Sequence, residues 1–142
     1  EGALGCAELP VAPKMIKQRQ KNAHYLIEKL QPVEHLIQLP SHPAHTEHAF
    51  MLFPLVVLPD AGFSKRDLVN YLEFKGIETR DLMPLLIQPH IKKLYNPDPA
   101  DYPVAHWINH HGFYIGCHQK MGQAELDYIV KIIFEFIKKQ RS

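Results

Sequence analysis

The stretch Gly76–Pro89, GIETRDLMPLLIQP, organises the rest of the chain. It follows a helix-like run, opens as a strand and ends in a loop bounded by prolines, and it carries Arg80 and Gln88. A second short stretch, FYIGCH at 113–118, has the composition of a partner strand. The sequence contains no Gly-rich phosphate loop, no Gly-x-Ser-x-Gly motif and no close carboxylate pair. Residue chemistry alone therefore predicts no catalytic residue in this chain.

Length and composition indicate one soluble globular domain. The chain has 142 residues, of which 46% are hydrophobic and 22% charged, which is ordinary for such a domain. The net charge of +1 argues against binding to nucleic acid or to an anionic membrane surface. No apolar run approaches the roughly 20 residues needed to span a bilayer. We therefore expect neither nucleic acid nor a membrane as a partner.

The N-terminus and the cysteines bear on the cellular setting. The first ten residues, EGALGCAELP, lack the basic and long apolar regions of a signal peptide. They also lack an initiator methionine, so we expect the chain to be a fragment, a processed product or a trimmed form. Two cysteines, Cys6 and Cys117, do not make a disulfide framework. These features predict a reducing, cytoplasmic setting.

Hydrophobic periodicity and turn residues predict the order helix, helix, strand, strand, helix, strand, helix, strand, helix. Pro10 and Pro13 should interrupt the first helices, and Pro54 suggests an edge, a bulge or a bend in the most apolar strand. Mixed hairpin-like and crossover connections predict an α+β domain, with a small antiparallel or mixed sheet and helices packed on one side. The expected helices are 1–9, 14–30, 65–75, 103–110 and 123–139, with one helical turn at 90–95, and the expected strands are 33–39, 49–58, 77–83 and 113–117.

The helix before the Gly76–Pro89 stretch has recognisable ends. Ser64 is a favourable N-cap, and Asp67 three residues later completes a weaker variant of the capping box. Gly76 occupies the position just past the helix, where a positive φ is common. The next strand should therefore begin near Ile77.

Ten histidines raise the question of a metal site. His42, His45 and His48 are spaced by three in a proline-rich loop, and His106 and His110 are spaced by four on an expected helix. Both spacings are compatible with metal ligation. No His-Glu-x-x-His or cysteine-pair signature accompanies them. We interpret them as solvated histidines and predict no metal site.

Cys117 and His118 are adjacent on the last expected strand. Neighbouring residues of a strand point to opposite faces, so the two side chains should not form a thiol–imidazole pair. Cys117 is expected to be a buried, small apolar residue. His118 then faces the other side at the end of a strand, where functional side chains often lie.

Arg80 lies on a strand that is otherwise largely apolar and must find a partner. One interpretation is an ion pair with a neighbouring acid such as Asp81 or Glu78. The other is recognition of a carboxylate or phosphate by the planar guanidinium group. The residues alone favour the ion pair.

Six segments of the chain, taken in sequence order, resemble the sugar aminotransferases of the DegT/DnrJ/EryC1/StrS family, which use pyridoxal phosphate (PLP). Each segment is modest alone, but their order and spacing together are specific, and they run nearly end to end. The segments are GALGCAEL (2–9), KQRQKNAHYLIEKL (17–30), EHAFMLFPLVV (47–57), GIETR (76–80), PLLIQP (84–89) and PVAHWINHHGFYIGCHQKMGQAELDYIV (103–130).

This resemblance implies that residues 1–142 form a single C-terminal small domain of a fold-type-I enzyme. Residues 1–30 would be the helices that connect it to an N-terminal domain. That missing domain would bind PLP, carrying the lysine that forms the Schiff base and the acid that pairs with the pyridine nitrogen. The whole enzyme, a homodimer, would transfer an amino group from an amino acid, usually glutamate, to a nucleotide-linked keto-sugar for polysaccharide or cell-surface sugar biosynthesis. The domain alone would be inactive.

Three residues match the family's motifs by position. His118 matches the Cys-His at the end of the last strand, which can face the sugar. Arg80 matches the arginine of Gly-Ile-x-Thr-Arg, and Gln88 matches the glutamine of the following Gln-Pro. The resemblance assigns these three residues to substrate binding, and it places no cofactor or metal ligand in this chain.

The sequence also departs from the family's usual pattern. Leu86 stands where many members have a histidine, Gln119 and Lys120 stand where many have Pro-Gly, and His90 and Ile91 stand where many have Tyr-Arg. These differences leave the substrate open. Two alternatives also stay open: a PLP-dependent sugar dehydrase of the same family, and a stand-alone α+β module that binds a small ligand.

Overall fold

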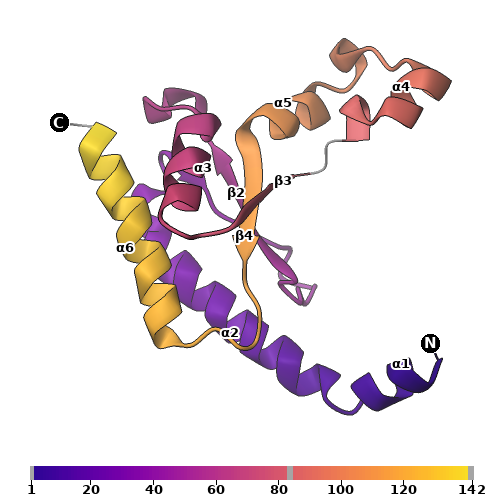
Figure 1. The fold of residues 1–142 in the computed structure, drawn as a ribbon, viewed down its shortest axis with the longest axis vertical. Helices are drawn as coiled ribbons and strands as arrows, with labels where there is room; N and C mark the ends of the chain where they lie inside the picture. The colour runs from indigo at the N-terminus through magenta and orange to yellow at the C-terminus, as the bar shows by residue number, and fades with distance from the viewer. Residues whose placement is uncertain (1, 83–84, 141–142) are drawn as a thin grey trace.

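The computed structural model describes residues 2–82 and 85–140. They form a four-stranded sheet with helices packed against it (Figure 1). Glu1, Met83 and Pro84, which the sequence placed in a helix tail, a strand end and a loop, lie outside the described residues. The helices are α1 Gly2–Glu8, α2 Ala12–Leu30, α3 Lys65–Phe74, α4 Pro89–Tyr95, α5 Pro103–His111 and α6 Gln123–Gln140, and the strands are β1 Ile37–Gln38, β2 Leu52–Val57, β3 Thr79–Asp81 and β4 Gly112–Gly116. Within the described residues, the connections contain four short 3-10 helices, η1 Gln31–Val33, η2 Pro59–Ala61, η3 Leu85–Ile87 and η4 Pro99–Asp101.

The sheet has the order β1-β2-β4-β3, and all its pairings are antiparallel. This confirms the predicted α+β class and settles the mixed alternative in favour of an antiparallel sheet. The register sets Pro54, Tyr114 and Arg80 side by side across β2, β4 and β3. Thr79 lies opposite Ile115 in the neighbouring row.

One face of the sheet carries the core. Along β2 every second residue is buried, and β4 buries Phe113 and Ile115 on the same face. Helices α2, α3 and α6 cover this face with their own apolar stripes. Burial of these side chains is the main favourable contribution to folding. The largest fully buried core side chains include Leu26, Leu30, Phe53, Leu55, Leu68, Leu72, Phe113, Ile115 and Ile133.

The ends of α3 follow the sequence prediction closely. The Ser64 hydroxyl accepts a hydrogen bond from the Asp67 amide, and the Asp67 carboxylate accepts one from the Ser64 amide. This is the predicted capping box. Gly76 follows the helix with a φ of 79°, a conformation that costs glycine little. The positive φ of Gly76 therefore turns the backbone out of α3 and toward β3.

The predicted strand at 33–39 is wrong over most of its length. Residues Gln31–Val33 form η1, and only Ile37 and Gln38 pair in β1. Turn hydrogen bonds from Glu34 to Gln31 and from Leu36 to Val33 hold the preceding backbone in a helical conformation. Pro32 favours this, because its fixed φ suits the first turn of a helix. Apolar spacing alone did not distinguish this turn from a strand.

The strand predicted at 49–58 is shorter in the structure, where β2 covers Leu52–Val57. Phe50 precedes it with a φ of 46° and a side chain that is 2% exposed. A left-handed residue interrupts the extended conformation, so pairing starts after it. Pro54 is accommodated because β1 pairs only with Val56 and Val57, which leaves β4 as the neighbour at Pro54 within the described sheet.

Other boundaries differ by a few residues. α2 begins at Ala12 because Pro13 fits the first turn of a helix, and α4 is two turns long from Pro89. β4 runs one residue earlier than predicted, Gly112–Gly116. The sequence signals for the ends of helices and strands are residues such as proline and glycine. They locate these ends only to within a residue or two.

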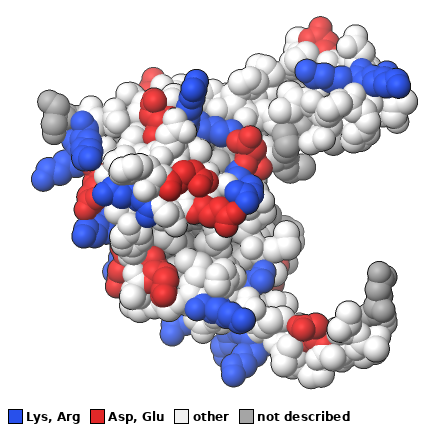
Figure 2. All heavy atoms as spheres, viewed as in Figure 1, with Lys and Arg blue, Asp and Glu red and all other residues white. Residues whose placement is uncertain are grey.

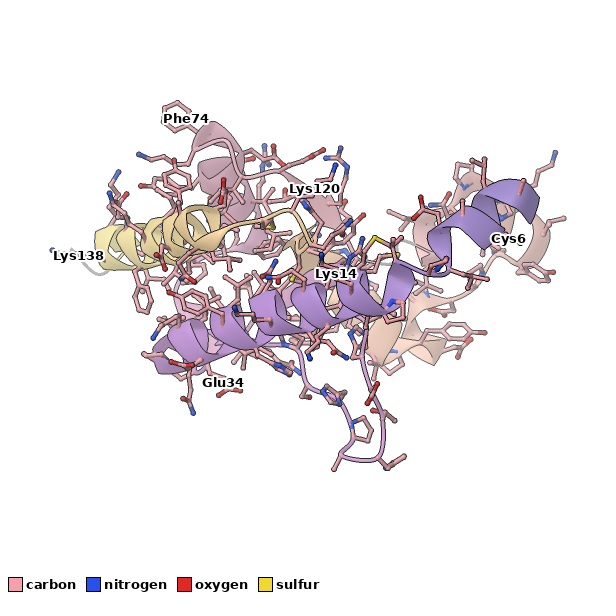
Figure 3. All side chains as sticks on the ribbon, turned by 90° about the horizontal axis from the view of Figure 1, so that it is seen from below. Cys6, Lys14, Glu34, Phe74, Lys120 and Lys138 are labelled. Carbon is pink, nitrogen blue, oxygen red and sulfur yellow. The ribbon has the colours of Figure 1, made fainter. Side chains whose placement is uncertain are left out.

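Two arms extend from the body of the molecule. Figure 1 shows α4 and α5 projecting at the end of the sheet where β4 begins, and α1 projecting at the opposite end. Figure 2 shows acidic and basic side chains interspersed over the body, with few on the surface between the arms. In Figure 3, α2 crosses the molecule and leads to α1, which carries the exposed Cys6. Among the described helices, none combines the length and the apolar character needed to cross a bilayer.

Candidate functional site

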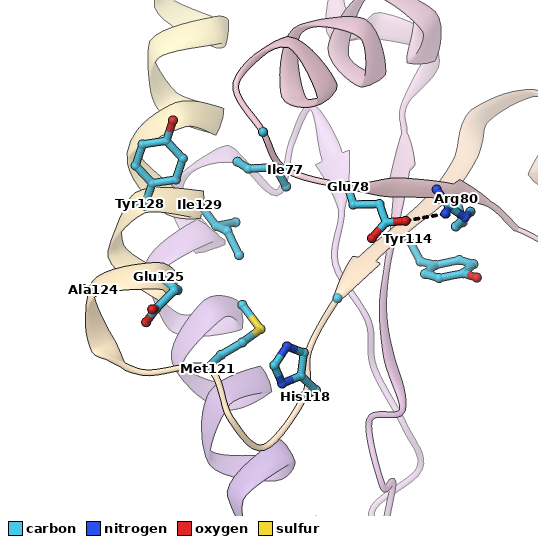
Figure 4. A pocket seen from close by; sticks show the side chains of 12 residues that line it. Ile77, Glu78, Arg80, Tyr114, His118, Met121, Ala124, Glu125, Tyr128 and Ile129 are labelled. Carbon is cyan, nitrogen blue, oxygen red and sulfur yellow. Dashed lines mark hydrogen bonds and ion pairs between the residues drawn. The ribbon is translucent and has the colours of Figure 1, made fainter.

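A pocket of about 670 Å³ opens where β3 and β4 face the beginning of α6 (Figure 4). A volume of this size falls in the range of small-molecule sites. Its floor is apolar, and its polar side chains come from the two strands, the residue before β3, the turn after β4, and α6. The lining residues are Gly76, Ile77, Glu78, Arg80, Tyr114, Gly116, His118, Met121, Ala124, Glu125, Tyr128 and Ile129.

Arg80 reaches the pocket from β3, and its position is set by the residue before it. Thr79 donates two hydrogen bonds to Glu73 of α3, from its backbone nitrogen at 2.6 Å and from its hydroxyl at 2.7 Å. These bonds hold the pKa of the Glu73 carboxyl below its usual value. β3 is thereby tied to the end of α3, and Arg80 is directed to the outer face beside Tyr114.

The Arg80 guanidinium forms an ion pair with Glu78 and donates to the Thr79 carbonyl at 2.9 Å. Asp81, the other candidate partner, pairs instead with Lys65 at 2.6 Å. The ion-pair interpretation of Arg80 is therefore confirmed for Glu78. Both side chains of this pair stay largely exposed, at 61% for Arg80 and 72% for Glu78, so the guanidinium is open to a ligand from solution.

His118 follows β4 on the turn that leads to α6. Its ring Nδ1 accepts a hydrogen bond from the Lys120 amide at 3.1 Å. An Nδ1 that accepts a hydrogen bond places the ring proton of the neutral imidazole on Nε2. The ring therefore offers a donor at the pocket. Cys117 is completely buried and His118 exposed, so the prediction that the two face opposite sides is confirmed.

Gln88 does not line this pocket. It is the residue before α4, half-buried, and its carbonyl accepts the first hydrogen bond of that helix from the Lys92 amide at 3.0 Å. The structure thus brings together Arg80 and His118 and leaves Gln88 at the base of the α4 arm.

Several lining residues were not singled out from the sequence. Tyr114 lies beside Arg80, and Tyr128 donates to the Lys75 carbonyl at 2.9 Å across the pocket rim. Glu125 accepts from the Gly122 amide at 3.0 Å and so is held at the start of α6. For Tyr114 a signal existed: the alternation that places Cys117 inside and His118 outside also places Tyr114 outside. Tyr128 and Glu125 reach the pocket because α6 packs against α2 and α3, which no local pattern reveals.

Several histidines outside the pocket make contacts with other rings. His48 and His42 lie around Phe50, with ring centroids 4.6 and 6.1 Å from it, and the His48 Nδ1 accepts from the Phe50 amide at 3.0 Å. The ring of His110 contacts that of His106, and its Nδ1 lies 2.8 Å from the His106 carbonyl oxygen. In the parts of the chain that the structure describes, no three His, Cys, Asp or Glu residues are arranged to hold a metal ion.

The pocket does not fit PLP as a resident cofactor. Covalent attachment of PLP requires a lysine amine at the site. None of the described residues that line this pocket is a lysine. The site is suited instead to a ligand that brings oxygen acceptors and an apolar face.

Comparison with known proteins places the chain. The profile of the DegT/DnrJ/EryC1/StrS aminotransferase family matches residues 1–134. The chain belongs to this family. The lipopolysaccharide biosynthesis protein RfbH of Salmonella typhimurium is 26% identical over 138 residues, which are 96% of this chain and 32% of RfbH. GDP-4-keto-6-deoxy-D-mannose 3-dehydratase of Escherichia coli is 27% identical over 139 residues, which are 93% of this chain and 34% of that enzyme.

The fold is shared with solved structures. Helicobacter pylori PseC, an aminotransferase involved in the biosynthesis of pseudoaminic acid, superposes with a TM-score of 0.82 at 17% identity, over 96% of this chain and 36% of PseC. The chain therefore spans about a third of the length of the family members that it matches. The family resemblance seen in the sequence is confirmed.

Proposed function

We propose that this chain is the C-terminal small domain of a PLP-dependent enzyme that transfers an amino group from an amino acid, usually glutamate, to a nucleotide-linked keto-sugar. The family match over residues 1–134 supports this, together with relatives named for lipopolysaccharide and pseudoaminic acid biosynthesis. The observation that carries the proposal is the convergence of Arg80 and His118 on one pocket, since both match family motifs and lie 38 residues apart in the sequence.

In this proposal the domain supplies substrate contacts, and the rest of the whole protein supplies the cofactor. PLP, bound by an N-terminal domain, would act as the electron sink. Arg80 would bind a phosphate oxygen through its planar guanidinium, displacing Glu78. The Nε2–H of His118 would donate to an oxygen of the sugar. Gln88 remains a proposed substrate contact from the α4 arm, and the domain alone would be inactive.

The connection to the rest of the protein would run through residues 1–30. α1 buries none of its described residues, whereas the second half of α2 packs in the core through Ala23, Leu26 and Leu30. We therefore propose that α1 and the start of α2 form the connection. As the family resemblance implies, we also propose that the whole enzyme is a cytoplasmic homodimer. Sedimentation of the full-length protein tests the dimer; a monomer at micromolar concentration would contradict it.

The second candidate is a dehydratase acting on a similar sugar nucleotide. The relative named GDP-4-keto-6-deoxy-D-mannose 3-dehydratase favours it, since it matches 93% of this chain at 27% identity. Both candidate enzymes would use PLP and a nucleotide-linked sugar. The identity of the reaction product therefore distinguishes them better than cofactor binding does.

The test uses the full-length open reading frame. Visible absorbance of bound PLP establishes the cofactor, and a spectral change on adding glutamate shows an amino donor. The protein is then given 15N-glutamate and a keto-sugar nucleotide, and the product is analysed by mass spectrometry. Nitrogen label in the sugar supports the aminotransferase. Loss of a sugar hydroxyl without label supports the dehydratase.

The stand-alone binding module makes a different prediction. An open reading frame that starts near Glu1, and a protein without visible absorbance after incubation with PLP, would support the module. That outcome would leave the fold and the pocket in place and overturn both enzyme proposals.

A further inference from the structure

Asn22 of α2 is buried against the turn that carries His118. Its side chain is 2% exposed, and a buried amide must find hydrogen-bond partners. Its Nδ2 donates to the His118 carbonyl at 2.9 Å and lies 3.5 Å from the Met121 carbonyl. Its Oδ1 accepts from the Gln18 side chain one turn earlier, at 2.8 Å. Both ends of the amide are therefore used.

The turn from His118 to Met121 is built around the same carbonyl. The Met121 amide donates to the His118 carbonyl at 3.2 Å, so this oxygen accepts from the turn and from Asn22 together. Inside the turn, the Lys120 amide donates to the ring Nδ1 of His118. The orientation of the ring thus depends on the backbone of the turn, and the turn is held on α2 by Asn22.

Neighbouring contacts fasten the same segment to α2. The Arg19 Nε donates to the Gln119 side chain at 3.1 Å, and the Cys117 thiol lies 3.7 Å from the Arg19 carbonyl. These contacts involve the residues on either side of His118. Asn22 differs from them because it binds the backbone of His118 itself.

We propose that Asn22 is a positioning residue for His118. Its amide fixes the carbonyls of the turn, the turn places the Lys120 amide on Nδ1, and the imidazole is thereby held with its proton on Nε2, facing the pocket as a donor. The acceptor that such a donor suits is a hydroxyl, carbonyl or phosphate oxygen. The identity of that oxygen as part of a nucleotide-linked sugar rests on the proposed function; the link between Asn22 and the ring does not.

Asn22→Asp tests this with almost no change of shape. The carboxylate loses both donors and faces two carbonyl oxygens, so the turn should detach from α2. In long-range 1H–15N spectra of the 142-residue chain, His118 should show the Nε2–H form in the wild type and a mixture of both neutral forms in the variant. Amide exchange at Lys120 and Met121 should accelerate at least tenfold. His118→Gln assigns the ring signals among the ten histidines.

Two further variants make the test decisive. Gln18→Ala removes the half-buried partner of the Asn22 oxygen and should produce a smaller change of the same kind in the His118 signals. If Asn22→Asp does not fold, this variant tests the positioning role. Leu68→Ala removes buried apolar volume in α3, away from the turn, and should lower stability without altering the His118 signals. If Asn22→Asp and Gln18→Ala affect only stability, as Leu68→Ala does, the proposal is overturned.

The readout requires no ligand. If the full-length protein converts no sugar nucleotide, the proposed function is overturned, but the dependence of the His118 ring orientation on Asn22 is not affected. An unchanged His118 spectrum would end the positioning role and leave the enzyme proposal intact.

Discussion

Glu73 holds the beginning of β3 through Thr79. The Glu73 Oε1 accepts from the Thr79 backbone nitrogen at 2.6 Å and from its hydroxyl at 2.7 Å. Thr79 is 6% exposed and directly precedes Arg80, so this contact also fixes where Arg80 enters the pocket. A helix C-terminus and a strand end are thus joined by one side chain.

Thr79→Val should lower the free energy of unfolding by about 1 kcal/mol, because valine keeps the shape and loses one hydrogen bond. Urea unfolding measures this change. Thr46→Val is a matched control: the Thr46 hydroxyl bonds the Pro43 carbonyl in an exposed loop, and its loss should change stability by less than about 0.5 kcal/mol. Equal effects at both positions would mean that the Glu73 contact contributes nothing specific.

The same contact predicts a pH dependence. The two hydrogen bonds from Thr79 hold the pKa of the Glu73 carboxyl below its ordinary value of 4.5. A carboxyl with a lowered pKa in the folded state stabilises the fold above its unfolded pKa and loses this effect as the pH falls through the folded pKa. Glu73→Gln should be less stable than wild type near pH 7, and the difference should shrink below pH 4.5. A difference that stays constant in urea unfolding across this range would refute the assignment.

Glu78 should compete with an anionic ligand for Arg80. The two side chains form an exposed ion pair at the pocket, and such pairs contribute about 0–1 kcal/mol. Glu78→Gln should therefore tighten binding of GDP-mannose, used as a stable nucleotide sugar, by up to about fivefold, and Arg80→Gln should weaken it. Calorimetric titration of the full-length protein measures both. The control Glu28→Gln, which breaks the pair with Lys29 on α2, should leave the affinity unchanged.

The two ends of α3, the helix that leads into the pocket strand β3, were predicted well from the sequence. Ser64, Asp67 and Gly76 each act through the backbone of their own helix, so local chemistry determines both ends of α3. The alternation in FYIGCH likewise predicts which side chains of β4 face out. The resemblance to the family assigns Arg80 and His118 to substrate binding, which stays a prediction, and the structure places both residues at one pocket.

Long-range contacts account for what the sequence did not predict. β1 exists only where Ile37 and Gln38 find Val57 and Val56, which lie about 20 residues later. Asn22 lies in the 17–30 segment that resembles the family, but no local pattern singles it out, because its contact is with a turn almost 100 residues away. Gln88 matches a family motif and lies at the start of the α4 arm. Its distance from the pocket depends on the orientation of that arm relative to the sheet, which no local pattern specifies.

The two cysteines should differ sharply in reactivity. Cys6 is exposed on α1, while Cys117 is completely buried, and burial raises the pKa of its thiol to about 11. Thiolate is the reactive form, so Cys117 should remain unmodified by iodoacetamide at pH 8 while Cys6 is alkylated. Mass spectrometry after proteolysis measures each site. In urea both should react, and modification of Cys117 at the rate of Cys6 in the folded chain would show that the residue after β4 is not packed as described.

Gly112 begins β4 where a side chain has no room. A Cβ there would lie 2.7 Å from the Ile108 carbonyl oxygen of α5 and 3.1 Å from the side chains of Ile108 and Leu82. Gly112→Ala should therefore cost about 1–3 kcal/mol in the free energy of unfolding, since backbone must move to admit the methyl group. Thermal or urea unfolding measures this. Unchanged stability would mean that the junction of α5 and β4 is looser than the structure shows.

Gly116, at the other end of the same strand, provides the contrasting case. A Cβ at Gly116 meets no atom within 4 Å, and the residue lines the pocket between Tyr114 and His118. Gly116→Ala should leave the free energy of unfolding within about 0.5 kcal/mol of wild type, because the methyl group enters open space. The same methyl group occupies part of the pocket, so the full-length protein should bind GDP-mannose more weakly. Weaker binding without lost stability would locate the ligand at this pocket, whereas unchanged binding would show that the ligand lies elsewhere.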